Sequence, residues 1–138
     1  DEDKAKLLEV ERELIFEKTK IESAMLPYTR SLRTVAFIIN RDHLSKNMSP
    51  LKIIDNSGEN GEVFIKFLEL EDLNDFLILI YVKNNSLESG KIVCELKLNP
   101  EKHTTHEFLF KEIFSFQERI IDEIIAMLER TRNQEKAS

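Results

Sequence analysis

An uninterrupted run of seven apolar residues, Phe76–Val82, predicts the centre of a β-sheet. The run is too short to span a membrane and is rich in β-prone residues, which is typical of a strand covered on both faces. Short polar turns separate it from two further strand patterns, Glu62–Leu70 and Lys91–Leu98, so the three are expected to form an antiparallel meander. Leu51–Asp55 predicts an additional edge strand, because Pro50 precedes it. The sequence therefore predicts about four antiparallel strands.

The predicted strands carry apolar residues on both faces. In the strand before the central run, one face holds Val63, Ile65 and Phe67, and the other holds Phe64, Leu68 and Leu70. We therefore expect both faces of the sheet to need cover. The last predicted strand places Cys94 among its apolar positions, which indicates a small buried core residue rather than a reactive thiol.

The N-terminal segment has the pattern of a coiled coil. Lys4 to Leu26 contains neither Pro nor Gly, and apolar residues alternate at spacings of three and four, with Glu17 as the polar exception. The predicted dimerisation residues are Leu7, Val10, Leu14 and Ile21. An amphipathic helix packed on its own domain remains the alternative, because only about three heptads are visible and further apolar residues widen the stripe.

Pro27 divides the predicted domains. Proline lacks an amide donor and disfavours helix at the preceding residue, so the coiled coil is expected to end or kink there. The predicted organisation is a coiled-coil segment at 1–26, a globular domain at 27–130 and a disordered polar tail at 131–138. The segment Tyr28–Leu44 fits either a helix or a buried strand, and its length favours a helix.

A final helix is predicted up to about Arg130. Thr104 and Glu107 have the spacing of a capping box, which places the start of this helix near them. Its apolar positions cover more of the helix than one sheet face would use, so the helix is buried on two sides or offers surface to a second protein. The predicted partner contacts are Phe108, Phe110, Phe114 and Ile121.

Composition limits the possible partners and locations. The chain has 138 residues and a formal charge of −6, with acidic and basic residues interspersed, so no basic stripe favours direct nucleic-acid binding. No long apolar segment or secretory signal is present, and Cys94 is the single cysteine. We therefore expect an intracellular protein, nuclear or cytoplasmic, without membrane contact.

No residue pattern points to catalysis. His103 and His106 lie near Glu101 and Glu107, but they fall on a loop and a helix cap and lack a supporting cysteine cluster. Only three glycines are present, so no glycine-rich phosphate loop exists, and no serine lies in a nucleophile elbow. The sequence predicts no enzyme activity, no metal site and no cofactor.

The order of elements resembles the RWD-like globular heads of coiled-coil kinetochore proteins. The stretch Phe76–Asn99, which ends in Cys94-Glu95-Leu96-Lys97-Leu98-Asn99, is similar to the central hairpin of the outer-kinetochore head subunits. Glu107–Phe110, with Ile113 and Phe116, is similar to the opening of the last helix of a monopolin subunit. The resemblance implies an RWD-like α+β domain that acts as a docking module in chromosome segregation.

Together these patterns predict a non-enzymatic α+β protein that forms a homodimer or heterodimer through its N-terminal helix. Its globular domain would dock partner peptides or helices. The alternative is a purely structural coiled-coil subunit that serves an assembly outside the kinetochore.

Overall fold

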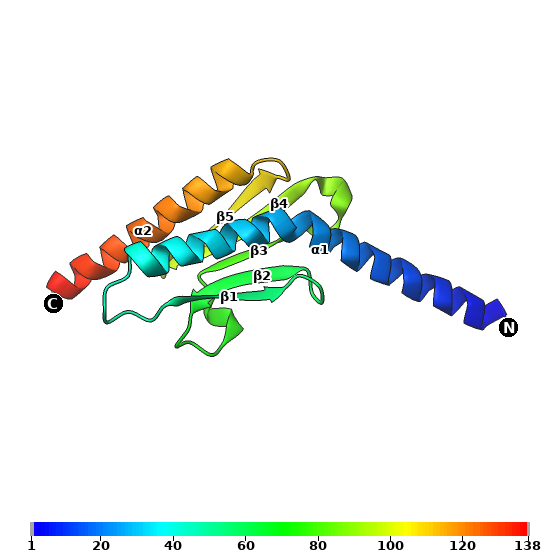
Figure 1. Cartoon of the computed structure of the whole chain (residues 1–138), viewed down its shortest axis with the longest axis horizontal. Helices are drawn as coiled ribbons and strands as arrows, with labels where there is room; N and C mark the ends of the chain where they lie inside the picture. Colours follow the sequence, from blue (N-terminus) through cyan, green and yellow to red (C-terminus); the bar gives the residue numbers. More distant parts are fainter. Residues whose placement is uncertain (1, 138) are drawn as a thin grey trace.

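The computed structural model describes residues 2–137 and the side chains of Glu2–Gln134. It is an α+β fold in which one long helix, α1 (Glu2–Asp42), precedes a five-stranded antiparallel sheet and a C-terminal helix, α2 (Ile113–Ala137). The strands are β1 (Leu51–Asn56), β2 (Glu62–Phe67), β3 (Ile78–Val82), β4 (Lys91–Asn99) and β5 (Lys102–Leu109). They lie in chain order, so the sheet is a simple meander with β3 at its centre (Figure 1). The predicted α+β class is confirmed, as is β1 as an edge strand.

The N-terminal helix does not end at Pro27. α1 runs for 41 residues with Pro27 inside it, and Figure 1 shows a change of direction between the blue and cyan halves of this helix. Pro27 cannot donate to the carbonyl of Ser23, but both residues are exposed, so water can bind that carbonyl. Met25 and Tyr28, on either side of Pro27, are fully buried and hold the helix against the sheet. The helix favoured for the segment after Pro27 is confirmed up to Asp42.

The fifth strand replaces the predicted start of the last helix. Thr104–Glu107 is not a capping box, because these residues pair with β4, where Thr104 lies opposite Leu96 and Glu107 opposite Val93. Two adjacent threonines favour a strand here, since β-branched side chains fit a pleated surface better than a helix. At the other end, α2 continues through Ala137, so residues 131–137 are helical where a disordered tail was predicted, and Ser138 lies outside the described residues.

Both helices pack on the same face of the sheet, so the cover expected on the other face must come from another part of the chain. The main core joins buried residues of α1 and α2 to one set of alternating strand residues, among them Ile65, Ile80 and Cys94. A cluster of three rings connects the layers: Phe116 of α2 contacts Tyr28 of α1 and Phe108 of β5, with ring centroids 4.8 and 5.3 Å apart. Edge-to-face contacts of this kind stabilise a core beyond simple burial.

The opposite face of the sheet is closed by local chain rather than by a helix. Phe64, Phe76 and Leu79 form a second small cluster there. The loop before β3 folds beneath it, and Lys97 donates to the carbonyl of Asn74 at 3.0 Å while its ammonium lies 4.1 Å from the centroid of the Phe76 ring. The cluster residues are consequently only 6–8% exposed, which is why this face needs no third layer.

Candidate interaction surfaces

The first 19 described residues of α1 project away from the rest of the molecule. We call residues 2–20 the stem and residues 21–137 the body. Every described side chain of the stem is exposed, whereas Ile21 is the first buried residue of α1 (Figure 1). The boundary between projecting helix and globular domain therefore lies at Ile21, six residues before the predicted boundary at Pro27.

Three of the four predicted dimerisation residues lie on the stem. Leu7, Val10 and Leu14 are 63%, 52% and 55% exposed, and the helix places them along one side at coiled-coil spacing. We call these three residues the seam. The body covers none of the seam, so the stem has the exposed apolar line of a helix that pairs with a partner.

The fourth residue, Ile21, belongs to the core of the body. It is 6% exposed and packs with Met25 and other buried residues. Ile21 follows Leu14 by seven residues, so the seam continues directly into the buried face of α1. A partner helix on the seam must consequently end or diverge before Ile21.

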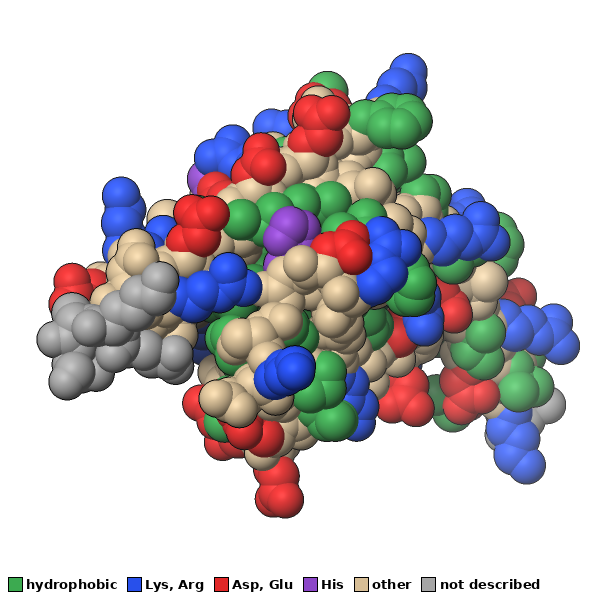
Figure 2. Space-filling model, turned by 60° about the vertical axis from the view of Figure 1, so that its left-hand side comes forward, with side chains coloured by type: hydrophobic (Ala, Val, Ile, Leu, Met, Phe, Trp, Pro, Cys, Tyr) green, Lys and Arg blue, Asp and Glu red, His purple; other side chains and the backbone are tan. Residues whose placement is uncertain are grey.

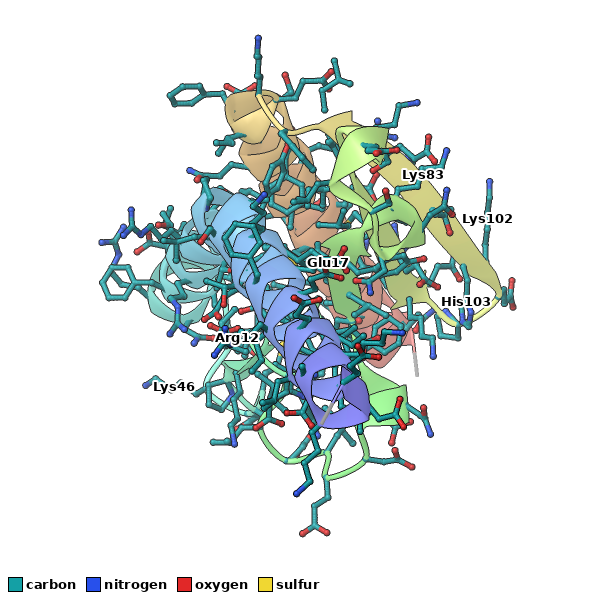
Figure 3. The ribbon with its side chains drawn as sticks, turned by 90° about the vertical axis from the view of Figure 1, so that its right-hand side faces the viewer. Arg12, Glu17, Lys46, Lys83, Lys102 and His103 are labelled. Carbon is teal, nitrogen blue, oxygen red and sulfur yellow. The ribbon has the colours of Figure 1, made fainter. Side chains whose placement is uncertain are left out.

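The junction between stem and body is hollowed. Glu17, Lys20 and Ile21 border a concave region of about 390 Å³ together with the loop residues Asn85, Ser86, Leu87 and Glu88. Figure 3, in which the stem points toward the viewer, shows Arg12 and Glu17 on the stem in front of the sheet. This loop flanks the helix where it leaves the body.

On the stem, three further large apolar side chains, Leu8, Ile15 and Phe16, are exposed outside the seam. Leu8 and Ile15 follow Leu7 and Leu14 directly, so they form a second ridge next to the seam, with Glu11 and Lys18 between the two. Phe16 lies farther round the helix, where the ammonium of Lys20 is 4.2 Å from its ring centroid. The second ridge provides chemically matched controls for substitutions in the seam.

The four predicted partner contacts near α2 differ in how far they are exposed. Phe108 lies on β5 in the core, where a partner could reach it only if the core opened. Phe110 and Ile121 are partly buried against the core. Phe114, in the first turn of α2, is 86% exposed and is accessible to another protein. Partner contact stays a prediction, and Phe114 is its best placed residue.

The polar residues considered for chemistry do not converge. The Nε2 atom of His106 lies 3.9 Å from a carboxylate oxygen of Glu123, which also pairs with Arg119, while His103 lies near the start of β5 (Figure 3). Glu107 instead binds Lys83 at 2.6 Å, and this contact lowers the pKa of its carboxyl group. Among the described residues, no three His, Cys, Asp or Glu side chains are arranged to hold a metal ion.

Cys94 lies deep in the core, and burial raises the pKa of its thiol above the ordinary value. A thiol in this environment is a poor nucleophile. Because Cys94 is buried, no reactive thiol lies on the surface of the described part of the chain.

One face of the molecule shows no single-sign field. Figure 2 displays acidic, basic and apolar side chains interspersed over one face.

No protein-family model, curated protein or solved structure matches the chain. Within residues 2–137, no helix has the length and apolar character required to cross a membrane. The interpretation of function therefore depends on the geometry of the stem and the body.

Sequence reasoning missed the position of the boundary between stem and body, although it did find Leu8 and Ile15 as residues that widen the apolar stripe. The apolar positions at Ile21, Met25, Tyr28 and Leu32 continue at helical spacing through Pro27, and that continuity was the available signal for an unbroken helix. Where the exposed part ends could not be found this way, because the same spacing describes both the seam and the buried face.

Proposed function

We propose that this chain is a non-enzymatic protein–protein interaction module that dimerises through the stem and presents its body to partner peptides or helices. The observation that carries the proposal is the seam, in which Leu7, Val10 and Leu14 are more than half exposed on a projecting helix. An exposed apolar line of this kind is stabilised when a second helix covers it.

The resemblance to kinetochore heads suggests the process. On that basis we propose a role in kinetochore or chromosome-segregation assembly in the nucleus. A structural coiled-coil subunit of another assembly is the alternative, and it would use the same stem without docking at the body.

The proposal is tested by the mass of the full chain in solution, measured by light scattering across a dilution series. We expect at least twice the chain mass of 16.2 kDa at high concentration and a decline toward one chain on dilution. A mass of one chain at every concentration would contradict self-association through the stem and leave only pairing with a different chain.

Glu17 limits the strength of the proposed pairing. It occupies the position after Val10 and Leu14 in the three-and-four spacing, so a partner helix would face a carboxylate there. Glu17→Leu should tighten association at least about tenfold, because burying one leucine side chain contributes about 1.5–3 kcal/mol.

The matched control is Glu9→Leu, since Glu9 is also exposed but lies on the side of the stem away from the seam. Analytical ultracentrifugation of both variants measures the dissociation constants. Equal tightening by the two substitutions would mean that any added apolar surface promotes association and that the seam has no special role.

A further inference from the structure

We infer that the partner of the stem is a second copy of the same chain, paired in parallel and in register. This inference rests on the dimerisation proposed above and specifies its partner. Its basis is the pattern of charged residues beside the seam. When two copies of the stem are aligned, this pattern brings opposite charges together in only some alignments.

The residues that flank the seam alternate in charge. With Leu7 and Leu14 at the first position of each heptad, Lys6 and Glu13 lie on one flank, and Glu11 and Lys18 lie on the other. All four side chains are exposed in the single chain and are available to a partner. In parallel two-stranded coils, each residue of the first flank faces the residue five positions later on the other helix.

The parallel alignment therefore pairs opposite charges at every such contact. Lys6 faces Glu11 of the second copy, Glu13 faces Lys18 of the second copy, and the two-fold symmetry repeats both pairs. Each seam residue packs against the same residue of the second copy. The pairing ends near Glu17, where the carboxylates of the two copies oppose each other. The helices then separate, as the burial of Ile21 in each body requires.

The antiparallel alignments are less favourable. Full overlap of the two stems, with Val10 opposite Leu14, brings Glu11 to Glu11, Glu13 to Glu13 and Lys6 to Lys20, so like charges face each other throughout. A shift by one heptad restores opposite charges but places Leu14 opposite Asp3. Only the parallel alignment combines matched charges with full use of the seam.

Disulfide trapping tests the orientation in the full chain. Val10→Cys places two thiols in one layer of a parallel dimer, within disulfide distance, whereas either antiparallel alignment separates them along the axis. Arg12→Cys is the control, because Arg12 occupies the sixth position of the heptad that begins at Leu7, on the side of the helix opposite the seam. We expect covalent dimers from Val10→Cys and few from Arg12→Cys in a glutathione redox buffer. The buried Cys94 leaves one reactive thiol in each variant.

Charge exchange tests the register and the identity of the partner. At low ionic strength, Lys6→Glu and Glu11→Lys should each weaken the dimer about three- to tenfold, and the double variant should return to within about twofold of the unmodified chain. Further weakening in the double variant would indicate the shifted antiparallel alignment, and tightening by Lys6→Glu alone would indicate full antiparallel overlap. Either result overturns the inference while leaving dimerisation intact. A chain that is monomeric at all concentrations would overturn the inference and self-association together.

Discussion

Phe116→Ala should destabilise the body by about 3–5 kcal/mol, the cost of removing a fully buried aromatic side chain. Phe116 joins three elements, because its ring packs against Tyr28 of α1 and Phe108 of β5. Loss of this ring leaves a cavity between the two helices and the sheet, and the surrounding rings can relax into it only partly. The free energy of unfolding, measured by urea denaturation at one fixed protein concentration, should fall accordingly.

The control for this substitution lies two residues away. Phe114→Ala removes the same side chain from the same helix, but Phe114 is 86% exposed, so the free energy of unfolding should change by less than about 0.5 kcal/mol. A loss of several kcal/mol from Phe114→Ala would show that this residue is part of the core in solution and would remove it as a partner contact.

The double substitution Leu7→Ser and Leu14→Ser should abolish association of the full chain. Each leucine is more than half exposed in the single chain, so its replacement costs the body nothing, but each would be buried in a dimer. Because every leucine is lost from both copies, four side chains that the dimer would bury, at about 1.5–3 kcal/mol each, are removed. Light scattering should then give the mass of one chain at all concentrations.

The second ridge provides the matched control for the seam. Leu8→Ser and Ile15→Ser together remove a similar amount of exposed apolar surface from adjacent positions. Association should be weakened far less by this pair than by the seam pair. If both pairs dissociate the dimer equally, the stem is buried on a wide face in a larger helical assembly, and a two-stranded seam is the wrong description.

The elements that could be predicted from sequence were those with a strong local pattern. The run Phe76–Val82 identified the centre of the sheet, and Pro50 correctly marked the edge strand after it. Thr104–Glu107 was misassigned because a capping box and an edge strand share polar residues at the same spacing, and only pairing with β4 decides between them. Of the two effects expected of Pro27, an end or a kink, the helix shows a change of direction and does not end, because burial of Met25 and Tyr28 outweighs one lost hydrogen bond.

The arrangement of the layers could not be predicted from local sequence patterns. Apolar residues on both faces of β2 indicated a sheet covered on both sides, but they could not show that the second cover is Phe76, the loop before β3 and the aliphatic part of the Lys97 side chain. For the interaction surfaces, spacing identified Leu7, Val10 and Leu14 correctly as one side of a helix, but it could not show that Ile21 is already occupied by the body.

The central claim is that association stabilises the stem, whereas the body holds the rest of α1. Hydrogen exchange of the backbone amides, followed by mass spectrometry at several protein concentrations, measures both halves of one helix in one experiment. We predict that amides of residues 6–18 are protected at high concentration and lose that protection on dilution, while amides of residues 25–42 stay protected throughout. Protection of residues 6–18 that is independent of concentration, or no protection at any concentration, would contradict the account.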